Sequence, residues 1–242
     1  FMKKVLLVLF TIIAAAALAL WVTIKLLQQF SVNVIAPIPP AQAGTVRIAC
    51  IGDSNTYGMM LWHRAANCYP AQLQKMLGDA YSARNYGANS TTVLSTGDHP
   101  YVDHKVFALS TDFAADTALI MLGSNDAKPE IWTSAEAFRA DYRALLQHYT
   151  ATVPTVIVVT PPSVIARDGK VSYDIDMEVL AEIAQIEREL AAEMGLPVLD
   201  IHALTSGQDA YFSSIDGVHM NQEGTDFLAR QVYEALNIAK ST

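Results

Sequence analysis

Val46-Arg-Ile-Ala-Cys-Ile-Gly-Asp-Ser-Asn-Thr-Tyr-Gly58 is the stretch that decides the fold of this chain. Its apolar half stops at Gly52, and Asp53 and Ser54 follow at once, which predicts a buried strand ending in a tight turn. In an open α/β sheet, ligands bind at this edge because loops and helix N-termini direct free backbone N–H groups toward it. Ser54 is therefore a candidate nucleophile, although Asp53 and Ser54 are equally well explained as caps of the next helix.

Strands and helices alternate along the rest of the body. Apolar runs predict four more strands, at 81–86, 117–122, 154–160 and 196–201. Apolar residues at helical spacing predict helices at 69–77, 104–115, 133–149, 175–194 and 223–238, with Thr133 and Glu136 spaced as a capping box. Buried strands that alternate with helices indicate an α/β fold, with a parallel five-stranded sheet covered on both faces.

Composition narrows the class of protein. The chain has 242 residues, and about 200 remain when the hydrophobic N-terminus is set aside. This length is enough for one domain with a sizeable core. A net charge of -8 and the lack of a Lys/Arg-rich run argue against nucleic acid as a partner. Cys50 and Cys68 are too few for a disulfide scaffold, so two buried thiols are favoured over a single bridge.

The N-terminus predicts a membrane anchor. Lys3 and Lys4 precede an uncharged, almost wholly apolar run from Val5 to Ile24, which is long enough to span a bilayer and longer than the apolar core of a cleavable signal. We expect residues 1–27 to form a transmembrane signal anchor, 28–44 a semi-extended linker, and 45–242 the catalytic domain. The lysine pair predicts a domain on the extracytoplasmic side of the cell membrane, or secreted if the segment is cleaved.

A serine nucleophile needs a base whose ring is oriented by an acid. His219 follows Asp216 by three residues, and Gly217 lets the backbone bend between them, so the carboxylate can reach Nδ1 and leave Nε2 for Ser54. His202 is a rival base, because strand alternation would put it on the same face as Asp200. The remaining histidines are His63, His99 and His104, which could line a pocket, and His148, expected at the surface. No HxH or HExxH pattern indicates a metal site.

An ester-cleaving serine also needs donors for the oxyanion of the tetrahedral intermediate. Gly87 and Asn125 both follow predicted strands and should face the same edge as Ser54, the first offering a backbone N–H and the second a side-chain amide. Either residue alone is equally typical of an ordinary turn.

Taken in order, Gly52-Asp-Ser54, Gly87, Gly123-x-Asn-Asp126 and Asp216-x-x-His219 resemble the SGNH (GDSL) hydrolase family from about Thr45 onward. The resemblance implies a flavodoxin-like three-layer α/β/α fold, with Ser54 as nucleophile, His219 as base and Asp216 as the residue that orients it. It further implies an oxyanion hole formed by the Ser54 N–H, Gly87 and Asn125, with no metal or organic cofactor. The one departure is Asn55 after the serine.

The substrate is expected to be a short-chain ester. Segments 57–69, 95–101 and 125–132 resemble the branch of the family that removes acetyl groups from sugars, and Tyr57, Tyr101 and Trp132 are candidates to pack on sugar rings. The expected function is a membrane-anchored serine esterase acting on carbohydrate O-acetyl groups, with a small-molecule or oligosaccharide ester as substrate. A lysophospholipase or thioesterase, and a non-catalytic glycan-binding protein on the same fold, are the alternatives.

Overall fold

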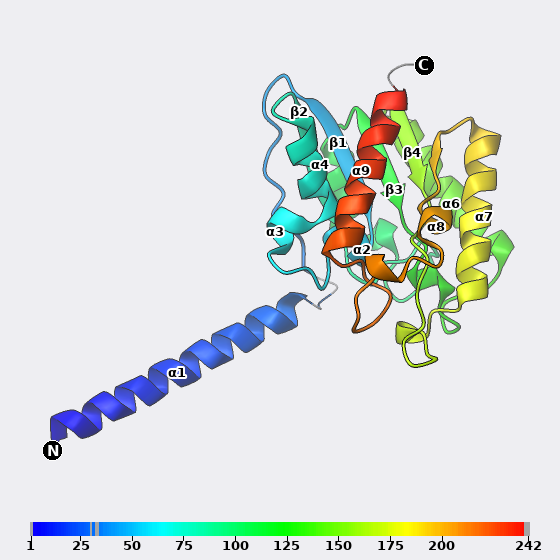
Figure 1. Cartoon of the computed structure of the whole chain (residues 1–242). Helices are drawn as coiled ribbons and strands as arrows, with labels where there is room; N and C mark the ends of the chain where they lie inside the picture. Colours follow the sequence, from blue (N-terminus) through cyan, green and yellow to red (C-terminus); the bar gives the residue numbers. More distant parts are fainter. Residues whose placement is uncertain (1, 30, 32–33, 240–242) are drawn as a thin grey trace.

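The computed structural model describes the chain except residues 1, 30, 32–33 and 240–242, and it leaves undescribed the side chains of residues 2–3, 5–8, 25–29 and 238–239. Five parallel strands form one sheet in the order β2-β1-β3-β4-β5 (Figure 1). The strands are β1 (Val46–Gly52), β2 (Tyr81–Gly87), β3 (Thr117–Met121), β4 (Thr155–Val159) and β5 (Val198–Leu199). The expected parallel five-stranded sheet is therefore confirmed.

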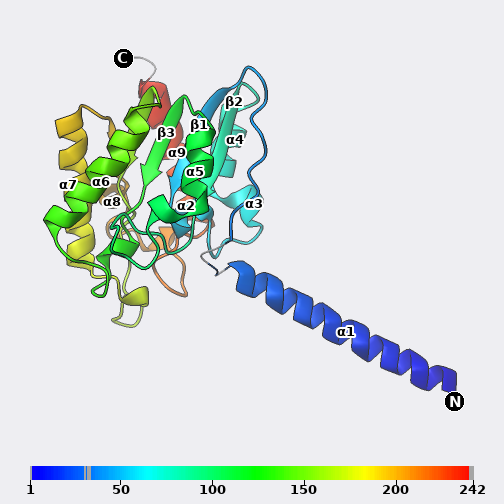
Figure 2. The same ribbon diagram turned by 180° about the vertical axis from the view of Figure 1, so that it is seen from behind.

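Helices cover both faces of the sheet (Figures 1 and 2). The helices α4 (Tyr69–Leu77) and α9 (Gln222–Ala239) lie on one face. The other face is covered by α5 (Lys105–Asp112), α6 (Ala135–Thr150) and α7 (Met177–Met194). This is the three-layer α/β/α architecture expected for a parallel sheet whose two faces are both buried.

The side chains of β1 show why the central strands are apolar throughout. Ile48 and Cys50 belong to the core beneath α4 and α9, whereas Ala49 and Ile51 belong to the core beneath α5, α6 and α7. Successive residues of a strand point to opposite faces, so a strand buried on both sides needs an uninterrupted apolar run. Cys50 and Cys68 are both buried free thiols, as favoured from the sequence.

Short helices occupy the loops that follow the carboxyl ends of the strands. They are α2 (Ser54–Tyr57), α3 (Arg64–Asn67) and α8 (Ile201–Thr205), together with the 3-10 turns Tyr101–Asp103, Asn125–Ala127, Ser172–Asp174 and Asp209–Tyr211. Several boundaries differ from the predictions by a few residues, and two of the differences have a clear cause. The fifth strand ends at Leu199 because the Asp200 side chain accepts from Ala203 N and starts α8, and α6 is capped by the Ser134 hydroxyl rather than by Thr133.

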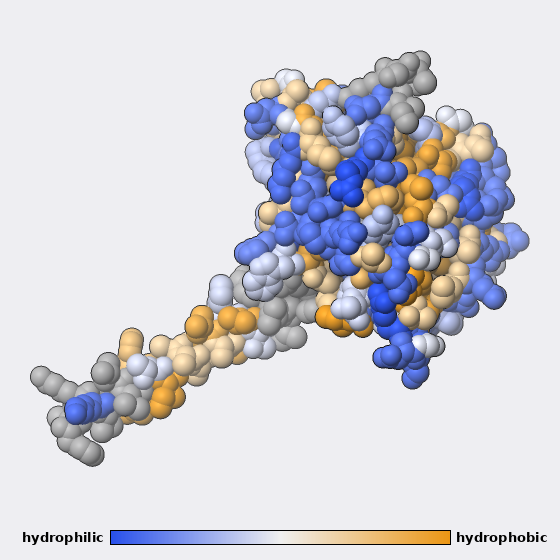
Figure 3. Space-filling view, in the orientation of Figure 1, coloured by the Kyte–Doolittle hydropathy of each residue, from blue (hydrophilic) through white to orange (hydrophobic). Residues whose placement is uncertain are grey.

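The N-terminal helix α1 comprises Met2–Gln29, and its described part exposes large apolar side chains such as Phe10 and Trp21 (Figure 3). Within the residues that the structure describes, no helix is both long and apolar enough to cross a membrane. The described residues thus give the predicted transmembrane anchor no support, and the anchor stays a prediction. Part of the predicted span, including Val5, and the flanking Lys3 and Lys25 lie outside the described side chains.

The end of the expected linker lies against the edge of the sheet. The Arg84 guanidinium of β2 donates to the backbone carbonyls of Pro39 (2.7 Å) and Pro40 (2.8 Å), and Gln42 N donates to the Ser82 hydroxyl (3.2 Å). Residues 39–42 are therefore fixed to the body immediately before β1 begins.

Candidate active site

Ser54 lies directly after the carboxyl end of β1, as the first residue of α2. Asp53 caps this short helix by accepting from Asn55 N (2.9 Å), so the capping explanation holds for Asp53 while Ser54 faces a pocket. Gly52 makes the tight turn possible. A Cβ there would lie 2.1 Å from the Thr56 hydroxyl and 2.5 Å from the Met121 carbonyl, so no side chain fits.

Three side chains from distant parts of the chain form a hydrogen-bonded row. His219 Nε2 lies 3.0 Å from Ser54 Oγ, and His219 Nδ1 lies 2.7 Å from Asp216 Oδ2. All three residues are buried. The geometry lets the imidazole accept the Ser54 proton at one nitrogen while the carboxylate holds the other nitrogen.

Asp216 is fixed by the loop on which it lies. Its Oδ1 accepts from the backbone N–H groups of Val218 (2.9 Å) and His219 (3.0 Å). Burial acts to raise the pKa of Asp216, but the bond and charge of His219 together with these two N–H groups outweigh it, so the pKa is lowered. Asp216 is therefore ionised at neutral pH.

Asn55 joins the serine turn to the histidine loop. Its Oδ1 accepts from Met220 N at 3.0 Å, next to His219. The sequence showed Asn55 only as a departure from the family pattern, whereas its side chain helps to hold the imidazole against the hydroxyl. Only the contact across the fold reveals this, because 165 positions separate the two residues.

Asn125 follows β3 and reaches the same pocket, as expected. Its Nδ2 donates to Thr91 O at 3.1 Å, which fixes the plane of the amide. Both Asn125 and Ser54 line the pocket, so a second amide hydrogen is available beside the hydroxyl.

Gly87 does not reach the pocket, contrary to the expectation. It is the last residue of β2, and its N–H donates to Asn85 Oδ1 at 2.9 Å. Gly87 is needed for packing, since a Cβ there would lie 2.2 Å from Tyr57 N. Ser90 lines the pocket instead, with a positive φ of 60° that turns the chain there.

The pocket is small, with a volume of about 40 Å³. Its lining includes, besides Ser54, Ser90, Asn125 and His219, three residues that the sequence did not single out as site residues: Met59, Lys128 and Tyr173. The Tyr173 ring stands edge-on to the His219 ring, with 5.4 Å between centroids, and 46% of the tyrosine is exposed. Tyr173 lies in an irregular segment with a φ of 60°, for which no sequence pattern gives a signal.

The three predicted sugar-stacking residues lie elsewhere. Tyr57 is buried, and the guanidinium carbon of Arg64 lies over the tyrosine ring, 4.3 Å from its centroid. Tyr101 is also buried, and its hydroxyl donates to Tyr86 O at 2.7 Å. Trp132 is half-buried and packs near Phe138, with 6.0 Å between ring centroids. None of the three is among the residues described as lining the pocket.

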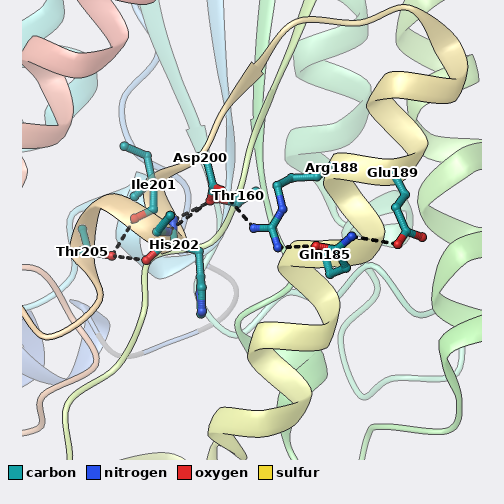
Figure 4. A network of polar contacts seen from close by, with 9 residues as sticks. Thr160, Gln185, Arg188, Glu189, Asp200, Ile201, His202 and Thr205 are labelled. Carbon is teal, nitrogen blue, oxygen red and sulfur yellow. Dashed lines mark hydrogen bonds and ion pairs between the residues drawn. The ribbon is translucent and has the colours of Figure 1, made fainter.

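His202 is not placed as the base. It lies in α8, and Asp200 is engaged by Thr160 Oγ1 (2.9 Å) and by Arg188 Nη1 (3.0 Å) (Figure 4). Of the other histidines, His148 is half-buried against Phe107 and Thr111, and neither it nor His63, His99 or His104 lines the described pocket. The described side chains include no group of three or more His, Cys, Asp or Glu placed to hold a metal.

The fold and the row of serine, histidine and aspartate define a serine hydrolase of the three-layer α/β class. Residues 50–227 match the model of the GDSL-like lipase/acylhydrolase family. The chain belongs to this family of ester hydrolases, which confirms the resemblance stated from the sequence.

Individual relatives agree with this assignment. The chain is 32% identical over 232 residues to an acetylxylan esterase of Xylanibacter ruminicola, covering 88% of this chain and 47% of that protein. The chain thus spans about half the length of that curated relative.

Solved structures show the same fold. A putative arylesterase from Agrobacterium tumefaciens is 26% identical, with a TM-score of 0.66 over 80% of this chain and 99% of that one. A carbohydrate acetylesterase from Sinorhizobium meliloti is 19% identical, with a TM-score of 0.66 over 81% of this chain and 100% of that one.

Proposed function

We propose that the protein is a serine esterase that removes acetyl groups from carbohydrate through an acyl-enzyme on Ser54. The observation that carries this proposal is the continuous contact from Asp216 through His219 to Ser54, with 2.7 Å and 3.0 Å between the paired atoms. Ser54 lies at the start of α2, and Asp216 and His219 are held together by one loop before substrate arrives, so little reorganisation precedes the reaction.

The reaction has two halves. Ser54 Oγ attacks the acetyl carbonyl carbon while His219 Nε2 takes its proton, and the resulting intermediate collapses to acetyl-Ser54. His219 returns the proton to the departing sugar oxygen. Water then attacks the acetyl group with His219 again as base, which releases acetate and restores the Ser54 hydroxyl.

The oxyanion of each tetrahedral intermediate needs fixed donors. We assign this role to Asn125 Nδ2, to the Ser54 N–H and to the N–H of Ser90, which replaces Gly87 in the predicted set. Ser90 and Asn125 line the pocket together with Ser54, whereas the Gly87 N–H is bonded to Asn85. Removing one such donor typically lowers kcat by about 10²–10³-fold.

The size of the pocket favours an acetyl group. The pocket beside Ser54 has a volume of only about 40 Å³, which suits a small acyl group such as acetyl. A long acyl chain would have to lie outside the pocket, which argues against the lysophospholipase and thioesterase alternatives.

Two observations favour a carbohydrate as the alcohol half of the ester substrate. The relative from Xylanibacter ruminicola is an acetylxylan esterase, and the exposed Tyr173 offers an aromatic face beside His219 on which a sugar ring could pack. Tyr173 takes the place of Tyr57, Tyr101 and Trp132 in this proposal. No role is needed for a metal or organic cofactor.

A substrate series tests the proposal. The full chain should release acetate from acetylated oligosaccharides and should hydrolyse aryl acetate faster than aryl butyrate or octanoate, because the longer chains exceed the pocket. Preference for the long chains would instead support the lipid-directed alternative. Lack of hydrolysis of every ester, with glycan binding retained, would support the non-catalytic one.

We further propose that the domain works on the extracytoplasmic side, on the basis of the Lys3 and Lys4 pair before the apolar run. Digestion of intact cells with an external protease tests this location. When the cell envelope outside the cytoplasmic membrane has been made permeable and the cytoplasmic membrane itself is still sealed, the protease should degrade the domain. Protection of the domain under these conditions would contradict the proposal.

A further inference from the structure

Two adjacent residues of one loop hold the segment that follows β2. Asn125 Nδ2 donates to Thr91 O at 3.1 Å. The next residue, Asp126, accepts from Leu94 N at 2.7 Å and from Val93 N, which lies 3.0 Å from each carboxylate oxygen. Ser90 directly precedes this segment, so the same contacts fix the distance between Ser90 and Asn125, two of the three proposed oxyanion donors.

The Asp126 carboxylate is fully buried at 0% exposure, beside two further buried carboxyl groups, Asp53 and Glu187. Asp53 faces it from the turn after β1, and Glu187 comes from α7, where neither of its carboxyl oxygens has a hydrogen-bond partner among the described residues. The other charged or titratable groups around this cluster are His219, Lys128, Arg188, Asp200 and the buried Tyr142.

We propose that Asp126 is a positioning residue for ester hydrolysis: as a carboxylate it clamps residues 93–94 and thereby aligns Ser90 with Asn125, and on protonation the clamp loosens. An ionised carboxylate only accepts hydrogen bonds, whereas a protonated one turns part of this capacity into a donor that faces two backbone N–H groups. This inference rests on the proposed oxyanion hole.

The pKa of Asp126 supports a clamp that responds to pH. Burial raises the pKa of Asp126 to about 7. The hydrogen bonds from the Leu94 and Val93 N–H groups act to lower this pKa, whereas the charge of Asp53 raises it further. Burial and the neighbouring Asp126 and Asp53 also raise the pKa of Glu187 well above its usual value. The clamp is therefore closed above about pH 7 and opens as pH falls.

Amide NMR shifts test the clamp without relying on catalysis. In the full chain carrying Ser54→Ala and His219→Ala, which removes the imidazole as a source of titration, the Val93 and Leu94 amide protons should shift with a midpoint near pH 7. Adding Asp126→Asn should abolish the shift. Adding Glu187→Gln should preserve it, because neither Glu187 oxygen is hydrogen-bonded to these amides.

Asp141→Asn is the matched control, since Asp141 accepts from Ser95 N at 2.7 Å, one residue beyond the clamp. In the otherwise unchanged chain, Asp126→Asn should lower kcat on aryl acetate by about 10–100-fold with little change in KM, whereas Asp141→Asn should change neither. Amides that do not move between pH 5.5 and 8.5, or a titration abolished by Glu187→Gln, would overturn the assignment. A normal amide titration in a chain without esterase activity would instead refute the proposed function and leave the clamp in place.

Discussion

At the scale of single residues, the row of Ser54, His219 and Asp216 could be predicted from two local patterns. Ser54 follows the end of a predicted strand at Gly52, and Asp216 precedes His219 by three positions with Gly217 between them. Tyr173 and Ser90 could not be predicted. Tyr173 lies in an irregular segment, and Ser90 adopts a positive φ that only a few per cent of non-glycine residues share. Glycine is the residue usually expected at such a turn, which is why Gly87 was preferred.

The Asp216→Asn variant tests the orienting role at this scale. An amide in place of the carboxylate favours the wrong tautomer of His219, and the corresponding change in a serine protease lowers kcat about 10⁴-fold. We expect a loss of a similar order on aryl acetate at pH 7.5, with KM little changed. Asp209→Asn, which alters an exposed carboxylate bonded to Arg167 (3.2 Å), is the control and should keep full activity.

At the scale of elements, long apolar or amphipathic stretches were predicted with their bounds nearly correct, as for the helix Tyr69–Leu77. The short elements were not. Two-residue β5 and five-residue α8 depend on Asp200, whose side chain caps the helix, and a pattern of alternating residues cannot distinguish this from a continuing strand. The end of β2 is likewise set by its pairing with β1, in which Gly87 lies beside Gly52.

The Gly87→Ala variant tests the packing role of that strand end. A new Cβ would lie 2.2 Å from the Tyr57 backbone nitrogen, so α2 or β2 must shift. We expect a loss of about 1–3 kcal/mol in the free energy of unfolding, measured by chemical denaturation, and a fall in activity from the displaced Ser54 turn. Gly44→Ala, at a positive φ but with open space around it, should cost only about 1 kcal/mol and leave activity unchanged. An unaffected Gly87→Ala variant would contradict this packing.

At the scale of the whole molecule, two layers of helices around a parallel sheet bring the loops after all five strands to one edge. That arrangement followed from the alternation of strands and helices. It also buries Asp53, Asp126 and Glu187 together beneath the site, which no local pattern indicates because the three carboxyl groups come from different elements. Burying these three carboxyl groups beside the active site therefore costs free energy of folding.

Stability should consequently fall as pH rises. Because the pKa of Asp126 is raised from 3.8 to about 7, its proton stabilises the folded state fully below pH 3.8, and this contribution is lost as pH rises to about 7. The difference corresponds to at most about 4 kcal/mol in the free energy of unfolding. Denaturant titrations at pH 5 and pH 8 should show a smaller change for Asp126→Asn than for the unaltered chain. An equal change in both would show that Asp126 does not titrate in this range.

The central claim is that Ser54 is a hydroxyl activated by His219 and able to form a covalent acyl-enzyme. Labelling with a fluorophosphonate, followed by mass spectrometry of the digested full chain, tests it most directly. We predict one modification, on the peptide that contains Ser54, absent from Ser54→Ala, strongly reduced in His219→Ala and retained in the control Ser95→Ala. An unlabelled native chain, or equal labelling of the Ser54→Ala variant, would contradict the account.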